Sequence, residues 1–189
     1  LVMTSATLGS HTDVFLQNDS VAYLIGHAGQ WADNPITVMN IRTGVHLEVP
    51  INYGSGGARF YGTQLGVFAH KKNKVLFMAM GLSPADISSF SIDPITHAIL
   101  GTGESPYHGD YSMGSTFYLS GNHDLLFTSA GTHFNSETLR YAGTLNVGQI
   151  QSMSHSTVAD EALVLLHYAG EQGFSRAELG KHVMRDAPR

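Results

Sequence analysis

The feature that most constrains the fold of this chain is a repeated pair of short apolar runs joined by a polar corner. The pattern occurs three times, at residues 14–26 (VFLQNDSVAYLIG), 67–80 (VFAHKKNKVLFMAM) and 116–131 (TFYLSGNHDLLFTSAG). Each corner is a short polar run that contains Asn, and two of the three also contain Asp or Gly. These residues tolerate the left-handed backbone of tight turns. Each segment therefore predicts a β-hairpin.

A second hairpin pattern follows each of the three. It occupies residues 36–49, 87–100 and 138–150, with expected corners at residues 42–44, 93–96 and 142–143. Three units of four strands each are therefore expected, and they begin at Val14, Val67 and Thr116.

A fourth, weaker copy starts at Ser156, with its second hairpin from Phe174. Ser175 and Glu178 have the spacing of a helix capping box, so a C-terminal helix is the alternative. We favour strands, because the repeat predicts them and Gly180 would weaken a helix at its middle.

Four-stranded units that recur every 40 to 50 residues or so are typical of β-propeller blades. We expect an all-β fold, a propeller-like array of about four four-stranded antiparallel blades in a single domain, residues 1–189. The blades are expected at residues 12–50, 62–102, 113–151 and 153–187, with innermost strands near 13–16, 65–69, 115–119 and 154–158.

Residues 90–99, Phe-Ser-Ile-Asp-Pro-Ile-Thr-His-Ala-Ile, carry a resemblance to a known family. The segment is similar to the third strand, turn and fourth strand that recur in the bacterial YVTN/WD40-like propeller superfamily. This resemblance implies the architecture and says little of activity, because propellers host enzymes and binding proteins alike. Gly26-His27 and Trp31-Ala32-Asp33 are out of register with the strict WD40 marks, which argues against a eukaryotic WD40 scaffold.

In such a fold, the loops between blades and between second and third strands emerge on one face. We expect function on that face, because its loops combine aromatic, histidine and amide side chains, the mixture that binding surfaces favour. The ligand-binding candidates are Trp31, Asn34, Tyr107, His108, Tyr111, His133 and Asn135. The opposite face is expected to be a rim of hairpin corners. Asn18-Asp19-Ser20, which matches the glycosylation pattern Asn-x-Ser, is interpreted as one of these corners.

Three functions remain open for this face. A binding or interaction module for a protein, peptide or carbohydrate ligand is favoured. The alternative is a propeller hydrolase or lactonase in which His108 and Asp110 form an acid–base pair. A metal ion held by His11 and His155 is the third possibility, although no two histidines have a chelating spacing within one segment. No other cofactor is expected.

The composition and charge of the chain narrow the classes of partner that it could bind. The net charge of −5, with no basic run beyond Lys71, Lys72 and Lys74, argues against nucleic acid. The longest apolar stretch, Val75 to Met80, is far shorter than the roughly 20 residues of a membrane span, so none is expected. The sequence has no cysteine, which leaves the redox compartment undetermined, and we favour a periplasmic or secreted location over a cytoplasmic one.

An open array of four blades would expose apolar strand surface at its two ends. We therefore expect a homo-oligomer or part of a larger propeller, with a four-bladed ring closed by residues 1–7 as the alternative.

Overall fold

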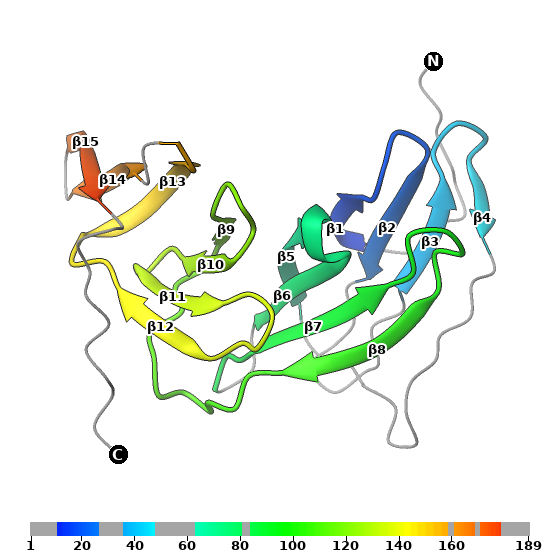
Figure 1. Ribbon diagram of the computed structural model, residues 1–189, viewed down its shortest axis with the longest axis horizontal. Coiled ribbons are helices and arrows are strands. Elements are labelled where there is room, and N and C mark those ends of the chain that lie inside the picture. The colour runs from blue at the N-terminus through cyan, green and yellow to red at the C-terminus, as the bar shows by residue number, and fades with distance from the viewer. Residues whose placement is uncertain are drawn as a thin grey trace. The chain divides into compact units, whose positions relative to one another are not determined.

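The computed structural model describes residues 11–26, 36–47, 63–80, 84–158, 161–168 and 171–178. Within these ranges the chain forms fifteen strands and one 3-10 helix, and neighbouring strands pair antiparallel in four sheets (Figure 1). The predicted all-β fold is confirmed. The chain divides into two compact units, residues 1–104 and 105–189, which are described separately below.

Unit 1 (residues 1–104) holds two four-stranded sheets, blades 1 and 2, each with its strands in chain order. Blade 1 consists of β1 (His11–Leu16), β2 (Val21–Gly26), β3 (Ile36–Asn40) and β4 (Val45–Leu47). Blade 2 consists of β5 (Thr63–Ala69), β6 (Lys74–Met80), β7 (Ile87–Ile92) and β8 (Ile99–Glu104), with the 3-10 helix η1 (His70–Lys72) at its first corner.

The two blades of unit 1 meet through one face each. Phe15 and Tyr23 of blade 1 share a buried cluster with Phe68, Val75 and Phe90 of blade 2. The ring centroids of Tyr23 and Phe90 lie 6.1 Å apart. Alternate residues of a strand point to opposite faces, so β2 contributes every second residue to this cluster, Val21, Tyr23 and Ile25.

Polar contacts fix the two blades of unit 1 at both ends of this interface. At one end, the backbone N–H of Gly66 donates to Asp13 Oδ2 at 3.0 Å. At the other, Tyr23 Oη donates to the carbonyl oxygen of His97 at 2.9 Å, and His97 Nδ1 lies 2.7 Å from Gln17 Oε1. Gly66 has no room for a side chain, because an added Cβ would lie 2.3 Å from the carbonyl oxygen of Leu76.

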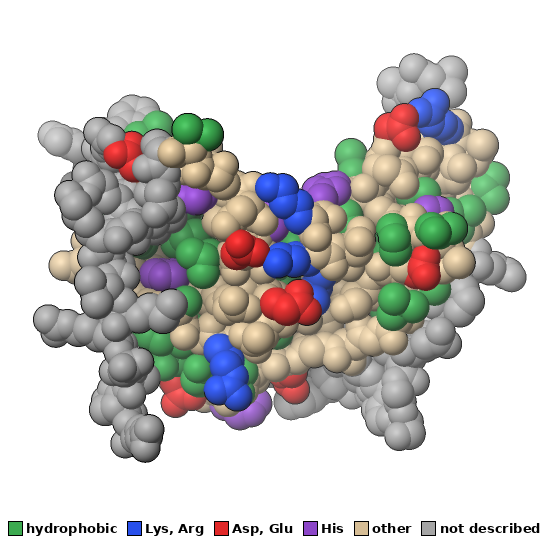
Figure 2. Space-filling view, viewed as in Figure 1, with side chains coloured by type: hydrophobic (Ala, Val, Ile, Leu, Met, Phe, Trp, Pro, Cys, Tyr) green, Lys and Arg blue, Asp and Glu red, His purple; other side chains and the backbone are tan. Residues whose placement is uncertain are grey.

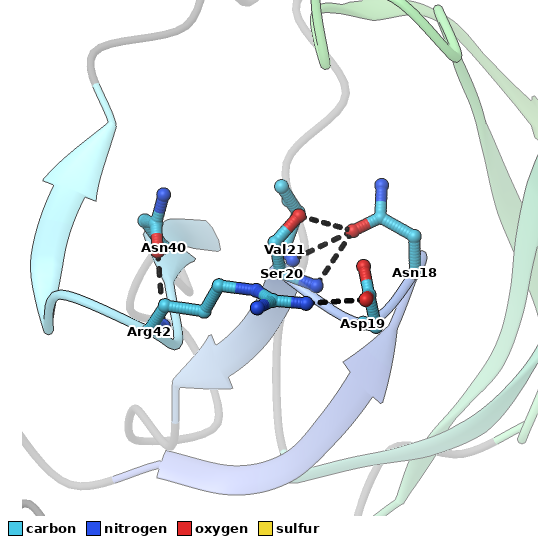
Figure 3. A network of polar contacts seen from close by, with 6 residues as sticks. All are labelled: Asn18, Asp19, Ser20, Val21, Asn40 and Arg42. Carbon is cyan, nitrogen blue, oxygen red and sulfur yellow. Dashed lines mark hydrogen bonds and ion pairs between the residues drawn. The ribbon is translucent and has the colours of Figure 1, made fainter.

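The predicted corners of unit 1 are confirmed. At the first, Asn18 Oδ1 accepts hydrogen bonds from the backbone N–H groups of Ser20 and Val21 at 2.8 and 2.9 Å, and Asp19 pairs with Arg42 of the next corner (Figure 3). Both charged side chains are largely exposed, so this ion pair contributes little stability. The structure thus makes Asn18 a turn-capping residue.

Unit 2 (residues 105–189) holds blades 3 and 4. Blade 3 consists of β9 (Phe117–Leu119), β10 (Leu125–Thr128), β11 (Thr132–Asn135) and β12 (Tyr141–Thr144). Blade 4 consists of β13 (Gln149–Ser156), β14 (Glu161–Tyr168) and β15 (Glu171–Glu178). The fourth strand expected for this blade would fall in residues 179–187, which lie outside the described residues. Phe127 of blade 3 shares a buried cluster with Ile150, Val164 and Leu166 of blade 4.

In unit 2, two predicted positions are wrong, and the structure decides between strand and helix for residues 175–178. The innermost strand of blade 4 is Gln149–Ser156 rather than 154–158, because Ile150 already pairs with Leu166 and packs in the cluster. The second hairpin of blade 3 turns at residues 136–140 rather than 142–143, because Asn135 caps that turn, while Ala142 forms a bulge in β12. Residues 175–178 lie in β15, so the alternative of a helix there is wrong.

The described residues include no helix of the length and apolar character that crossing a membrane requires. At the upper right of the face drawn in Figure 2, an acidic and a basic side chain lie side by side.

Candidate functional site

The candidate site lies in unit 2, on the segment of residues 105–116 that precedes β9. Several local hydrogen bonds shape this segment. Ser105 Oγ accepts from the backbone N–H of Tyr107 at 3.3 Å, and Ser129 Oγ accepts from that of Ser115 at 2.7 Å. Buried Met113 anchors the segment between these two points. The segment is thereby held against blade 3.

Three tyrosines gather where this segment lies on β11 and β12. Tyr111 stacks on Tyr141 with ring centroids 4.1 Å apart and planes 4° apart, and Tyr107 meets Tyr111 edge-on at 4.8 Å. All three rings pack around buried Phe134, at centroid distances of 5.8 to 6.2 Å. Aromatic rings favour these offset and edge-on arrangements. We call Tyr107, Tyr111 and Tyr141 the tyrosine patch; each is partly exposed to solvent.

Hydrogen bonds hold the patch together. The backbone N–H of Tyr141 donates to Tyr107 Oη at 3.2 Å, so a side chain from the loop covers the backbone of β12 there. Tyr141 Oη lies 2.8 Å from Thr144 Oγ1 on the same strand. Partial burial, followed by the neighbouring Tyr107, Tyr141 and Asp110, raises the pKa of the Tyr111 hydroxyl. The Tyr111 hydroxyl is therefore neutral at physiological pH.

His108 and Asp110, the candidate acid–base pair, lie beside the patch. Both residues are exposed, and Asp110 Oδ2 accepts from the backbone N–H of His108 at 3.3 Å. The carboxylate thus closes the local turn. This geometry adds no support to the hydrolase or lactonase alternative.

His133 and Asn135 lie elsewhere than expected. Both belong to strand β11 and not to a loop. His133 is 6% exposed and packs on Phe127 at a centroid distance of 5.0 Å. Asn135 lies at the hairpin corner, where its Oδ1 accepts from the backbone N–H groups of Glu137 and Thr138 at 3.0 and 2.9 Å. Neither residue therefore lies in a loop, and their role in ligand binding stays a prediction.

The two metal candidates lie in different units, and each has a contact within its own unit. His11 Nε2 lies 3.4 Å from Thr37 Oγ1 in blade 1. His155 Nδ1 accepts from the backbone N–H of Gly121 at 3.0 Å in unit 2. Among the described residues, no group of three or more His, Asp or Glu side chains is arranged to hold a metal ion. The metal ion stays a prediction.

Two further ligand-binding candidates, Trp31 and Asn34, fall outside the described residues. Conversely, the structure adds Tyr141, which sequence reasoning missed because it placed the hairpin corner next to that residue. The sequence signal for Tyr141 was Asn135, whose capping of the preceding turn puts Tyr141 opposite Phe134 in the sheet.

Comparison with known proteins supports the architecture alone. No protein-family model and no curated protein matches the sequence. Among solved structures, hydrazine synthase of Kuenenia stuttgartiensis is similar, with a TM-score of 0.58 and 10% identity over 95% of this chain and 49% of that one. TolB of Acinetobacter baumannii, a β-propeller, is similar with a TM-score of 0.53 and 9% identity over 89% of this chain and 41% of TolB.

This chain thus spans half or less of the length of either structure. At such low identity the likeness shows the fold and no activity. Together with the four antiparallel sheets, it identifies the chain as propeller-like.

Proposed function

We propose that this chain is a binding module and that its tyrosine patch contacts a protein or peptide segment that carries Lys or Arg. The observation that carries the proposal is the stack of Tyr111 on Tyr141, which is partly exposed and does not belong to the buried cluster of Phe127. Tyrosine is enriched at contact surfaces because its large, rigid ring loses little conformational entropy on binding. A propeller-like fold is compatible with such a role.

The charge beside the patch supports the choice of a basic segment. Asp110 is exposed and close enough for its carboxylate to raise the pKa of Tyr111. A Lys or Arg side chain placed over the tyrosine rings would gain a cation–π contact and the attraction of this carboxylate. The net charge of the chain, −5, attracts basic segments over longer range.

Selection from a peptide display library tests the proposal. We expect the selected peptides to contain Lys or Arg beside an apolar residue. Tyr111→Leu should weaken their binding about tenfold, and Asp110→Asn should weaken it several-fold and reduce its salt dependence. Glu137→Gln, which removes another exposed carboxylate of blade 3, is the matched control and should bind as the unaltered chain does.

Selected peptides without basic residues, or peptides that bind both variants unchanged, would contradict the proposal. The same chains on a glycan array separate the other ligand class. A glycan whose binding is lost in Tyr111→Leu would replace the peptide by a carbohydrate as the ligand of this patch.

A further inference from the structure

Within the described residues, the tyrosine stack keeps one ring face that no other ring covers. Tyr111 and Tyr141 lie face to face, and the ring centroid of Phe134 is 5.8 Å from that of Tyr111 and 6.0 Å from that of Tyr141. These nearly equal distances place Phe134 beside the stack and not over an outer face. Tyr107 contacts the ring of Tyr111 and, among the described residues, not that of Tyr141, so it lies on the far side of Tyr111. The outer face of the partly exposed Tyr141 is the flat surface that remains.

The exposed carboxylate of Asp110 keeps most of its capacity to accept hydrogen bonds. Its Oδ2 accepts one bond, from the backbone N–H of His108 at 3.3 Å, and within the described part of the chain no donor reaches its Oδ1. A carboxylate has about four acceptor sites and can take two N–H groups of one guanidinium at the same time. The bond to the turn therefore orients the carboxylate and leaves room for a ligand with two donors.

Buried hydroxyls fix the segment that carries Asp110 before any ligand binds. Thr132 Oγ1 donates to the carbonyl oxygen of Ser112 at 2.6 Å, and Ser129 Oγ accepts from the backbone N–H groups of Ser115 and Thr116 at 2.7 and 3.3 Å. Both Thr132 and Ser129 are buried. A carboxylate held on a fixed segment loses less conformational entropy on binding. It also favours a ligand whose donors have a matching fixed geometry.

These features distinguish between the two basic side chains. The guanidinium of arginine is planar, stacks on aromatic faces and presents its N–H donors in a rigid fork that matches a carboxylate. The ammonium of lysine is a compact and strongly hydrated point charge, which can approach a ring but cannot lie flat on it while two fixed donors meet one carboxylate. The flat ring face and the oriented carboxylate together favour arginine.

We propose that the cation recognised at the tyrosine patch is the guanidinium of arginine, packed flat on a tyrosine ring and donating two N–H groups to the carboxylate of Asp110. This inference rests on the proposed function and makes it more specific, because lysine would satisfy that proposal equally well. Phosphate and carboxylate groups are unsuited to the same place, since the charge of Asp110 repels them.

Titration calorimetry with synthetic peptides tests the choice of cation. One peptide selected from the display library is made in three forms, with arginine, lysine or citrulline at its basic position. Citrulline keeps the planar shape of arginine and is neutral. We expect the lysine form to bind about fivefold more weakly than the arginine form, and the citrulline form about tenfold more weakly.

Two variants locate the origin of this preference. Asp110→Asn keeps an oxygen that accepts from the N–H of His108 but loses the charged fork acceptor, so the arginine and lysine forms should bind within about twofold of each other. Tyr141→Leu removes the open ring face and should weaken the arginine form more than the lysine form. Glu137→Gln, outside the patch, is the control and should keep the fivefold preference.

The outcomes separate this inference from the proposed function. Equal affinity for the arginine and lysine forms, with both weakened by Tyr111→Leu, would overturn the choice of arginine and leave the basic ligand in place. A preference for arginine that persists in Asp110→Asn would show that the carboxylate is not the group recognised. Citrulline that binds as tightly as arginine, or a library that selects no basic peptide, would overturn both.

Discussion

Single Asn and Asp residues stabilise the hairpin corners through hydrogen bonds to the backbone N–H groups that follow them. Asn18 and Asn40 do so in blade 1, Asp93 in blade 2 and Asn135 in blade 3. Short polar side chains favour this geometry, because they reach the backbone two or three residues ahead. The corners are therefore determined locally, without help from the core.

Asp93 makes one of these corners sensitive to pH. Hydrogen bonds from the backbone N–H groups of Thr96 and Ile95 lower the pKa of Asp93 from its usual 3.8. A lowered pKa in the folded state means that the carboxylate stabilises the fold above the unfolded pKa and stops doing so as the pH falls through the folded pKa. We expect Asp93→Ala to lower the melting temperature at about pH 6, and by less near pH 2.

Calorimetry over a pH series measures this difference. Asp93→Asn keeps an acceptor oxygen and has no titrating group, so its melting temperature should stay closer to that of the unaltered chain at about pH 6. A gap between Asp93→Ala and the unaltered chain that is the same at both pH values would show that the carboxylate charge contributes nothing.

At the scale of strands and sheets, large buried side chains between blades supply most of the stability. Phe90, on β7, is fully buried and contacts the rings of both Tyr23 and Phe77. It thus joins blade 1 to blade 2. Its loss would leave a cavity that the paired strands around it cannot close without breaking their register.

We expect Phe90→Ala to lower the free energy of unfolding by about 3 to 5 kcal/mol, the usual cost of truncating a buried phenylalanine. Denaturant titration measures it. Ile95→Ala removes an apolar side chain that is 84% exposed, and should change stability by less than about 0.5 kcal/mol. Similar losses in both variants would mean that Phe90 does not lie between blades.

The hairpins that the sequence predicts correctly have corner residues that act locally. The corner of blade 3 that it misplaces has Leu139, which adopts a φ of 56° without being Gly or Asn. In the sequence, Gly143 suggests a turn. In the structure, glycine is required at this position of β12 because an added Cβ would lie 2.8 Å from the ring of His133. That constraint joins two strands and is invisible in the order of residues.

The candidate site shows the same division. The sequence predicts Tyr107 and Tyr111 on a loop, since Pro106 and the glycines around them break strand patterns. It does not predict that His133 is buried against Phe127, or that Tyr141 stacks on Tyr111. Both facts depend on how β11 pairs with its neighbours, and an error of a few residues in the corner changes which side chains meet.

At the scale of the whole molecule, each of the two units has a buried cluster of its own. Phe90 belongs to the cluster of unit 1, and Phe127 to that of unit 2. Repeat architectures gain stability from each unit and from contacts between neighbours. Damage to one cluster should therefore be felt first within its own unit.

Hydrogen exchange measured by mass spectrometry tests this expectation. Phe90→Ala should speed exchange in β5 to β8 while β9 to β12 exchange as in the unaltered chain, and Phe127→Ala should do the reverse. Equal acceleration in both units by either change would show that the chain opens as one cooperative body.

The corner of blade 2 at residues 93–96 also offers a site for attaching a label. Ile95 is 84% exposed, and the hydrogen bonds of the turn begin at Asp93, so the tip contributes little to packing. Replacing the Ile95 side chain leaves the hydrogen bonds of the turn in place, because they use the backbone N–H groups of Ile95 and Thr96. A fluorescent label attached through Ile95→Cys would therefore mark unit 1 without touching its interface, while the tyrosine patch belongs to unit 2.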